Sequence, residues 1–236
     1  MLRYYYIIFT SLIFEIYYFL KTNYVIRHRY RYTNEQCYKL VRNVIKLIKI
    51  QGYIFTRVYG LENLPEEGGY IMYPNHQGKY DALGIMYSHK RRCSFVMDKK
   101  KSTAPLTYQI FQLSNSLGME LDNVRQSLGI IREVAERVKE GERFIIFPEG
   151  GYAKNRNHMR EFKPGCFKSA LMAKCPIIPV VLVDSWKVFN YPSLLDVHTQ
   201  VHYLKPIPYE EYRNMNTREI ADLVKSRIET VLAANR

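Results

Sequence analysis

The chain has 236 residues, of which 47% are hydrophobic, so it is long enough to bury one sizeable core. Lysine and arginine outnumber aspartate and glutamate by 35 to 22, giving a formal net charge of +13, which implies an anionic partner such as a membrane surface, a phosphorylated substrate or a nucleic acid. The cysteines show neither C-x-x-C spacing nor a histidine pair at zinc spacing, which argues against a disulfide framework or a metal site and favours reduced thiols at Cys37, Cys93, Cys166 and Cys175.

The first segment, residues 4–20, is apolar and rich in tyrosine. Glu15 interrupts it and Lys21 ends it, so it falls short of the roughly 20 apolar residues of a clear transmembrane span. No small-residue cleavage site follows, so we expect the segment to be retained rather than removed as a signal peptide. Tyrosine side chains such as Tyr4 favour the boundary between hydrocarbon and headgroups. The segment is therefore predicted to be an anchor that lies in the membrane or crosses it shallowly.

Residues 37–50 are predicted to form a basic amphipathic helix, because apolar and basic side chains recur on opposite faces at helical spacing. The apolar side chains are Cys37, Leu40, Val41, Val44, Ile45 and Ile48, and the basic ones are Lys39, Arg42, Lys46 and Lys49. The neighbouring apolar segment favours an interfacial membrane helix, and a surface helix docked on the protein core is the alternative. The basic run RHRYRY over residues 27–32 would lie near anionic headgroups, although it could also stack on single-stranded nucleic acid.

From about residue 53, short β-rich runs alternate with helical ones, which is typical of an α/β domain. The β-rich runs are IFTRV, YIMY, SFVM, FIIF, IIPVVLV and VHYL. One helix is expected over 123–140, with Gly141 at its C-terminal end, and a last helix from Thr217, its N-cap, to about Ala234. The side chains expected to face the core are Leu128, Ile131, Val134, Ala135 and Val138 in the first helix and Ile220, Leu223, Val224, Ile228 and Val231 in the second. The sequence therefore predicts a single α/β domain, a mixed sheet flanked by helices over 53–236, preceded by N-terminal membrane-docking helices over 1–52.

A histidine stands just beyond the strand YIMY, in the run PNHQGKYD, with a carboxylate five residues further on. Loops at strand ends are where active sites are built. On a regular helix His76 and Asp81 would lie on different faces, so they meet only if the intervening residues include a turn, which Gly78 permits. If they meet, Asp81 accepts the Nδ1 proton of His76 and leaves Nε2 as a base for a hydroxyl of the substrate. A structural or solvated His76 is the alternative, because this spacing also arises by chance.

Two further segments place polar groups where a ligand could bind. The strand FIIF leads into a loop with Glu149 and Gly150, where the backbone can approach a ligand closely and a carboxylate can accept hydrogen bonds from a polyol. In FKPG, Lys163 precedes a small-residue helix that begins at Gly165, so an ammonium group and backbone N–H groups would converge on an anion such as a phosphate. The run CPIIPVVLV, with Pro179, is interpreted as a core strand.

The ordered combination N-H-x4-D, F-P-E-G, K-P-G and I-I-P-V over residues 54–206 resembles the glycerophospholipid acyltransferase family, in particular its bacterial 1-acylglycerol-3-phosphate (lysophosphatidate) acyltransferases. The resemblance implies a membrane-associated enzyme that moves a fatty acyl group from acyl-CoA or acyl-acyl carrier protein to the sn-2 hydroxyl of lysophosphatidate, giving phosphatidate, at the cytoplasmic face of the cell membrane. It implies His76 as the general base, Asp81 as its partner, and no metal or prosthetic group. The substrate-binding residues that it implies are Asn75, Glu149, Gly150, Lys163, Gly165 and Arg125.

The chain departs from the family's pattern in two places. Thr and Arg usually follow F-P-E-G, where this chain has Gly151 and Tyr152, and the second family block usually ends in Asp-Arg, where it has Asp122 and Asn123. The basic side chains that would compensate are Arg125, Lys154, Arg156 and Arg160. Another lysophospholipid acceptor and a catalytically degenerate lipid-binding relative are the alternatives. A hydrolase is disfavoured by the lack of a G-x-S-x-G motif, and a nucleic-acid partner is not expected because it would leave the four motifs unexplained.

Overall fold

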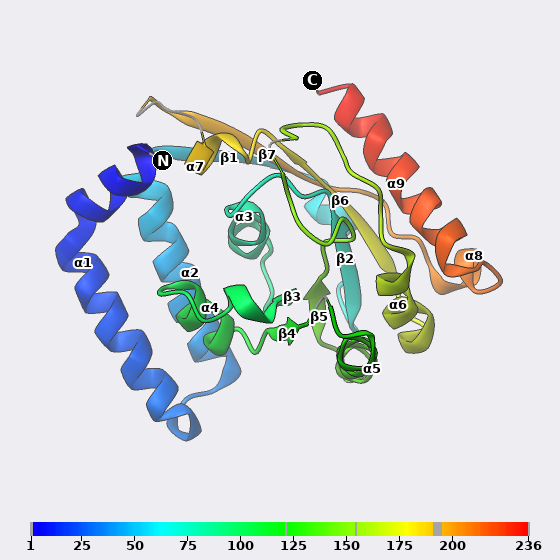
Figure 1. Ribbon diagram of the computed structural model, residues 1–236, viewed down its shortest axis with the longest axis horizontal. Coiled ribbons are helices and arrows are strands. Elements are labelled where there is room, and N and C mark those ends of the chain that lie inside the picture. The colour runs from blue at the N-terminus through cyan, green and yellow to red at the C-terminus, as the bar shows by residue number, and fades with distance from the viewer. Residues whose placement is uncertain (1, 121, 154, 191–194, 236) are drawn as a thin grey trace.

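The computed structural model describes residues 2–120, 122–153, 155–190 and 195–235, which form a mixed sheet between two layers of helices (Figure 1). The strands are β1 Ile54–Tyr59, β2 Tyr70–Pro74, β3 Ser94–Asp98, β4 Leu117–Met119, β5 Arg143–Ile145, β6 Ile177–Val183 and β7 Val197–Tyr203. The α-helices are α1 Leu2–Arg27, α2 Asn34–Gln51, α3 Asp81–Ser88, α4 Thr107–Leu113, α5 Val124–Lys139, α6 Lys168–Ala173, α7 Lys187–Asn190, α8 Tyr209–Tyr212 and α9 Thr217–Ala233. Short 3-10 turns are η1 Arg29–Arg31, η2 Leu61–Asn63, η3 Lys99–Lys101 and η4 Pro164–Phe167.

The sheet has the strand order β1-β7-β6-β2-β5-β3-β4. Strands β6, β2, β5, β3 and β4 run parallel to one another, whereas β7 pairs antiparallel with β6 and β1 pairs parallel with β7. The carboxyl ends of the five parallel strands therefore meet at one edge of the sheet. In open α/β sheets this is the edge where ligands bind. The prediction of a mixed sheet flanked by helices is confirmed.

The central strands are apolar throughout because both of their faces are covered by helices. In β2, Tyr70 and Met72 enter one buried cluster with side chains of α2, α3 and α4, whereas Ile71 and Tyr73 enter a second cluster with side chains of α5, α6 and α9. Strand β6, which contains Pro179, is buried along its whole length, as expected for a core strand. The two clusters make the sheet the rigid support for the loops at its carboxyl edge.

Helix α2 docks on the protein core. The structure therefore shows a docked surface helix, which was the alternative interpretation, and not an interfacial membrane helix. Thr33 and Gln36 begin the helix with a capping box, in which each side chain accepts a hydrogen bond from the backbone N–H of the other. All six apolar side chains predicted for its inner face are buried in the cluster beneath the sheet. Of the basic side chains expected in solvent, Lys39 and Lys46 are exposed, but Arg42 and Lys49 are half-buried. Arg42 donates to the Tyr87 carbonyl at 3.1 Å, and Lys49 donates to the Thr56 hydroxyl at 2.6 Å.

Helix α1 continues through Glu15, which does not interrupt it. It packs along α2 and α4 at the outer edge of the molecule (Figure 1), and its described large apolar side chains are largely exposed. Within the described residues, no helix has both the length and the apolar character needed to cross a bilayer. The side chain of Tyr4 lies outside the described part of the chain, so its predicted interfacial position stays a prediction.

Several details of the remaining elements differ from the sequence predictions. Helix α9 begins at Thr217, but its N-cap is Asn216, whose Oδ1 accepts hydrogen bonds from the N–H groups of Arg218 and Glu219. Leu128 on α5 is exposed rather than turned to the core. Strand β4, with three residues, was not predicted, because so short a run carries no periodic pattern. Helix α5 ends as expected, with Gly141 at a φ of +93°.

Candidate active site

His76 lies in the loop after β2, at the edge where the carboxyl ends of the parallel strands meet. Its Nδ1 is 2.7 Å from Oδ2 of Asp81, which is the first residue of α3. The backbone makes the turn that brings the two together, with the Asp81 N–H donating to the Gly78 carbonyl at 3.3 Å. The turn does not require a glycine at position 78, because a Cβ atom added there would have no neighbour closer than 3.7 Å. The predicted pair therefore exists as a hydrogen-bonded dyad.

Asp81 is held as a hydrogen-bond acceptor from several sides. Besides His76, its carboxylate accepts from the backbone N–H groups of Gln77 at 2.5 Å and Gly78 at 2.9 Å, and from the hydroxyl of Ser185 at 2.5 Å. Its side chain is fully buried, whereas that of His76 is 15% exposed. A carboxylate fixed in this way accepts the Nδ1 proton and leaves Nε2 of the neutral imidazole as the nitrogen with a free lone pair. The dyad can therefore act as a general base.

Two aromatic rings contact the imidazole of His76. Phe147, which follows β5, stacks on it with ring centroids 4.0 Å apart and an angle of 25° between the planes. Tyr152 stands nearly perpendicular to it at 74°, with centroids 4.7 Å apart. Together with the hydrogen bond to Asp81, these contacts define the plane of the imidazole. Neither ring was recognised in the sequence as part of the site.

Glu149 fastens the loop after β5 to the loop after β2. Its Oε1 accepts from the N–H of His76 at 2.7 Å and its Oε2 from the N–H of Arg160 at 3.1 Å. Only 2% of the residue is exposed, and this burial raises its pKa above the ordinary value, against the opposing effect of the two N–H groups. Both oxygens are thus engaged by the protein itself. Its predicted contact with the acyl acceptor stays a prediction, and the structure adds a supporting role for the His76 loop.

Asn75 is likewise used within the fold. Its Nδ2 donates to the carbonyl of Leu182 on β6 at 3.0 Å, and its Oδ1 accepts from the Leu182 N–H at 2.7 Å. The residue is buried, so both of its amide groups extend the pairing of β2 with β6 past the end of the strand. The structure thus adds a supporting role for Asn75 within the fold, and its predicted contact with the substrate stays a prediction.

The remaining predicted site residues are less closely associated with the dyad. The side chain of Lys163 lies over Gly150, where an added Cβ would be 2.6 Å from Nζ. Gly165 is exposed in η4, and the helix expected to begin there is divided into η4 and the short α6. Arg125 is exposed in the first turn of α5, and β4, which precedes it, is three strands from β2, roughly 14 Å at about 4.8 Å per strand. The structure therefore brings His76, Asp81, Glu149, Gly150 and Lys163 together, and the predicted substrate contacts of Arg125 and Gly165 stay predictions.

Comparison with known proteins decides the family. The acyltransferase family model matches residues 55–183, more than half of the chain. The chain belongs to the acyltransferase family. It is 27% identical over 205 residues to the 1-acyl-sn-glycerol-3-phosphate acyltransferase alpha of Bos taurus, covering 84% of this chain and 70% of that protein. It is 28% identical over 193 residues to the 1-acyl-sn-glycerol-3-phosphate acyltransferase of Escherichia coli K12, covering 77% and 78%.

The fold of this acyltransferase is shared with a solved structure. The crystal structure of the 1-acyl-sn-glycerophosphate (LPA) acyltransferase PlsC from Thermotoga maritima matches with a TM-score of 0.70, covering 96% of each chain at 18% sequence identity. The prediction that the chain is an acyltransferase is thus confirmed by its family. The roles assigned to individual residues rest on the geometry described above.

Besides Phe147 and Tyr152, the sequence did not identify Ser185 and Gln77 as residues of the site. Ser185 follows β6, and its hydroxyl donates to Asp81. Gln77 uses Nε2 to bind the carbonyl of Leu182 at 2.7 Å and Oδ1 of Asn157 at 2.8 Å, which ties the His76 loop to β6 and to the loop after β5. The strand-end rule that pointed to His76 would also have pointed to Ser185, because it stands two residues after the apolar run IIPVVLV.

One of the two departures of this acyltransferase from the family pattern has a structural role at the start of α5. Asn123 is the N-cap of α5, and its side chain accepts from the N–H of Gln126 at 3.1 Å. Of the basic side chains expected to compensate, Arg156 lies 5.1 Å from the ring of Trp186, and Arg160 donates to the Gly151 carbonyl at 3.3 Å. The other residue expected to compensate, Lys154, lies outside the described part of the chain.

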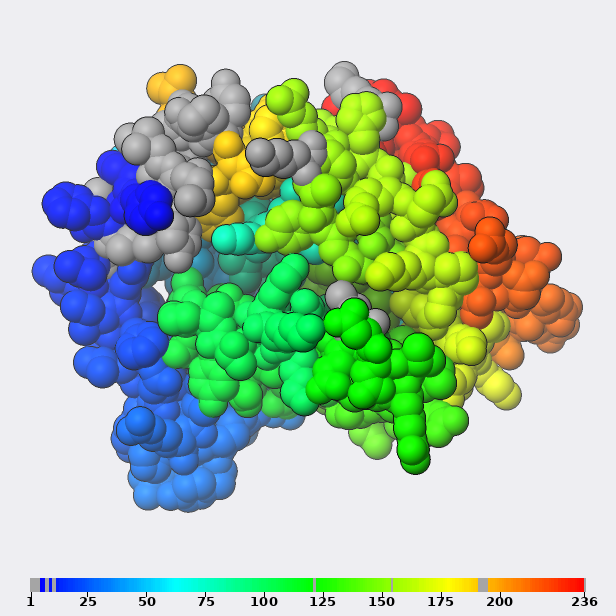
Figure 2. All heavy atoms as spheres, in the orientation of Figure 1, coloured from blue at the N-terminus to red at the C-terminus, as the bar shows by residue number. Residues whose placement is uncertain are grey.

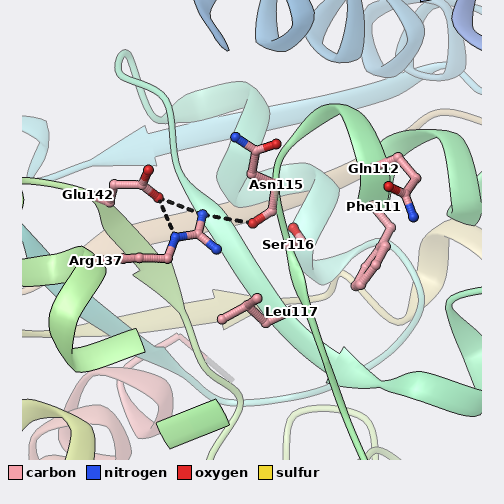
Figure 3. Close-up of a pocket in the computed structure, with 7 residues that line it drawn as sticks. All are labelled: Phe111, Gln112, Asn115, Ser116, Leu117, Arg137 and Glu142. Atoms are coloured by element: carbon pink, nitrogen blue, oxygen red, sulfur yellow. Dashed lines mark hydrogen bonds and ion pairs between the residues drawn. The ribbon is translucent and has the colours of Figure 1, made fainter. Parts of the chain in front are cut away.

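A pocket of about 390 Å³ lies at the opposite edge of the sheet, beside the amino ends of β3, β4 and β5 (Figure 3). Its charged groups already pair with one another, since Arg137 donates to Glu142 at 2.6 Å and to the Asn115 carbonyl at 2.8 Å. His76 follows the carboxyl end of β2, so this pocket is separate from the acyltransferase site. In the described part of the chain, no three His, Cys, Asp or Glu side chains are grouped to hold a metal ion, and the independence from metals and cofactors stays a prediction.

Proposed function

We propose that this acyltransferase moves a fatty acyl group from acyl-CoA or acyl-acyl carrier protein to the sn-2 hydroxyl of a lysophosphatidate, giving phosphatidate. The observation that carries the proposal is the His76–Asp81 hydrogen bond of 2.7 Å at the carboxyl edge of the sheet. The names of relatives from Bos taurus and Escherichia coli support the choice of acceptor. An intact dyad argues against the alternative of a degenerate, purely lipid-binding relative.

In the proposed mechanism, Nε2 of His76 takes the proton of the acceptor hydroxyl while the oxygen attacks the thioester carbonyl. The new C–O bond forms as the carbonyl π electrons move to oxygen, and the tetrahedral oxyanion then collapses with loss of the thiolate, which receives the proton from the imidazolium. The carboxylate of Asp81 stabilises that imidazolium and keeps the ring in the required tautomer. General-base catalysis of this kind typically contributes about 10²- to 10⁴-fold in rate, and positioning adds to it.

Positive charge on the loop after β5 supports an anionic acceptor. Lys163 and Arg160 are both exposed there, and Glu149, which lies between the dyad and these cations, is engaged by backbone N–H groups. An acceptor phosphate near Lys163 would gain a charge-assisted hydrogen bond. The predicted acceptor site is therefore the surface between His76 and Lys163.

The experiment is acyl transfer to lysophosphatidate by detergent-solubilised protein, with acyl-CoA and acyl-acyl carrier protein supplied separately. Wild type is expected to form phosphatidate, His76→Ala to lose at least about 10²-fold in kcat, and Asp81→Asn to lose activity through the wrong tautomer. His198→Ala, at an exposed histidine on β7, is the matched control and should retain wild-type turnover. Asp81→Asn with wild-type activity would refute the dyad, and no product with either donor would redirect the search to other lysolipid acceptors.

We also propose that α1 docks on the cytoplasmic face of the cell membrane. Figure 2 shows the helix (blue) along one side of the molecule, where Phe9 is 84% and Ile13 81% exposed, with Ile16 and Leu20 following at helical spacing. Apolar side chains in such a row are matched by a lipid interface, and the net charge of +13 suits an anionic leaflet. Free thiols at all four cysteines are consistent with the cytoplasmic side.

Flotation with vesicles of phosphatidylglycerol and phosphatidylethanolamine tests this docking. Wild type is expected to float with the vesicles and Ile13→Glu to bind at least about 10-fold more weakly, because a buried apolar side chain is worth roughly 1.5–3 kcal/mol and a carboxylate adds a desolvation cost. Val124→Glu is the control, because Val124 is also exposed, at 75%, but lies on α5. Equal binding by all three proteins would remove α1 from the docking surface.

A further inference from the structure

Tyr152 is the residue of the active-site loop whose role the proposed reaction leaves open. It stands two positions after Gly150, it is half-buried, and its ring is perpendicular to that of His76 at a centroid distance of 4.7 Å. The ammonium group of Lys101, in the turn after β3, lies 5.6 Å from the centroid of the Tyr152 ring. Tyr152 thus contacts both His76 and the turn after β3.

The backbone holds Tyr152 in this place. Gly150 and Gly151 have φ angles of +69° and +153°, which residues other than glycine rarely adopt. These two glycines turn the chain back toward β2. The segment is fastened on both sides: the guanidinium of Arg160 donates to the Gly151 carbonyl at 3.3 Å, and Asn155 accepts from the Ala153 N–H at 3.1 Å. Asn155 also donates to the His76 carbonyl at 3.3 Å. The ring therefore has a fixed support.

The hydrogen bond to Asp81 fixes one atom of the imidazole, and an imidazole held at one atom can still pivot about that bond. The stacked ring of Phe147 restricts movement toward one face, and the perpendicular ring of Tyr152 supplies the second contact. Aromatic pairs in stacked and edge-to-face geometries attract each other beyond the effect of burial alone. Displacement of a reacting group by about 1 Å can lower a rate by about 10²-fold, so such restriction affects turnover directly.

The tyrosine also suits the charge that develops on His76. Burial, and secondarily the charge of Asp81, raise the pKa of Tyr152 above its ordinary value, so the phenol stays neutral. A neutral ring adjacent to the imidazole imposes no cationic repulsion on the imidazolium formed during transfer.

We propose that Tyr152 is a positioning residue, whose ring, with that of Phe147, clamps the imidazole of His76 so that Nε2 faces the acceptor hydroxyl. The inference rests on the proposed role of His76 as the base. The proposal assigns the positioning of His76 to the aromatic ring of Tyr152 and not to its hydroxyl. Substitution by phenylalanine, which keeps the ring and removes the hydroxyl, therefore separates the two contributions.

Steady-state kinetics and chemical modification together test the clamp. Tyr152→Leu should lower kcat about 10- to 100-fold with KM values for both substrates within about 3-fold of wild type, and Tyr152→Phe should restore kcat to within about 3-fold. Without substrate, diethyl pyrocarbonate should modify His76 faster in Tyr152→Leu than in wild type, as followed by mass spectrometry. Tyr59→Leu is the matched control. Tyr59 also stacks on a histidine, His202, with ring centroids 4.5 Å apart, but this pair lies on β1 and β7 and does not belong to the site.

Three results would overturn the clamp. These are wild-type kcat in Tyr152→Leu, a Tyr152→Phe protein as impaired as Tyr152→Leu, and a loss confined to KM, which would make Tyr152 a substrate-binding residue. If wild type forms no product from any donor, the proposed function fails, but the modification rate of His76 still decides whether Tyr152 restrains the ring. An unchanged modification rate would then also reject the clamp.

Discussion

Asp81 organises the candidate site at the scale of single residues, because one carboxylate collects hydrogen bonds from two separate segments of the chain. It receives the imidazole and two N–H groups of the loop after β2, and the Ser185 hydroxyl from beyond β6. A hydrogen bond to a charged group is worth about 1.5–3 kcal/mol, and the other donors remain when one is removed. Ser185→Ala is therefore expected to lower kcat by about 3- to 10-fold, well short of the loss in His76→Ala.

The control for Ser185→Ala is Ser169→Ala. Ser169 is equally buried, but its hydroxyl donates to the Cys166 carbonyl at 2.7 Å, away from the dyad. Both variants should lose some thermal stability, measured as Tm, and only Ser185→Ala should lose turnover. Equal kcat in the two variants would mean that the hydroxyl of Ser185 does not contribute to the orientation of Asp81.

The part of the site that the sequence predicted is the part contained in one motif. His76 and Asp81 are five residues apart, so a turn is enough to join them. Ser185 lies 104 residues from Asp81, and Glu149 bonds the N–H of His76 across 73 residues, so these contacts depend on the strand order, which one sequence does not give. Tyr152 was visible only as a departure from a family pattern, without its contact to the imidazole.

At the scale of elements, the same distinction applies to α2. Its periodicity correctly identified six side chains on one face, but an apolar face is matched equally well by lipid and by a protein core. The favoured membrane interpretation was wrong for this face, because the sheet and α3 cover it. Conversely, the sequence could not predict which face of α1 is exposed. Nearly every side of that helix is apolar or aromatic, so no periodicity distinguishes the exposed row that contains Phe9 and Ile13.

Lys49 is a basic side chain of α2 that the core partly encloses. It reaches the Thr56 hydroxyl at 2.6 Å, and burial lowers its pKa to about 8. Because the folded-state pKa lies below the unfolded value of 10.5, the charged amine opposes folding below pH 8, and this cost disappears as the pH rises toward 10.5. Lys49→Met is therefore expected to stabilise the protein at pH 7, by up to about 1 kcal/mol after allowance for solvent screening.

Urea denaturation at pH 7 and pH 10 measures this effect. The advantage of Lys49→Met over wild type should shrink at the higher pH, where the wild-type amine is neutral in the folded state. Lys46→Met, at an exposed position of the same helix, should match wild type at both values. A Lys49→Met protein less stable than wild type at pH 7 would show that the hydrogen bond to Thr56 outweighs the desolvation of the amine.

At the scale of the whole molecule, the free energy of unfolding should depend on pH through His89. This histidine is fully buried between the end of α3 and the start of β2, where its Nε2 accepts from the Tyr70 hydroxyl at 2.6 Å and its Nδ1–H donates to the Arg91 carbonyl at 2.6 Å. Burial, reinforced by the charges of Arg143, Arg91 and Arg42, lowers its pKa from 6.5 to about 4. The neutral imidazole is thus built into the packing of the helical layer on the sheet.

Between pH 6.5 and pH 4 the unfolded chain binds a proton at His89 that the folded chain excludes, so stability falls as the solution is acidified through this window. Each pH unit between the folded and unfolded pKa values corresponds to about 1.4 kcal/mol, so the loss from this one group is on the order of 3 kcal/mol. His89→Gln keeps an acceptor for Tyr70 and a donor for Arg91 without the titration, so it should be less stable than wild type at pH 7 but lose less on acidification. His198→Gln, at an exposed histidine, should keep the wild-type slope. The test is the urea midpoint of each protein measured from pH 7 to pH 4. If the midpoints of wild type and His89→Gln fall equally with pH, the acid sensitivity of the fold comes from other groups.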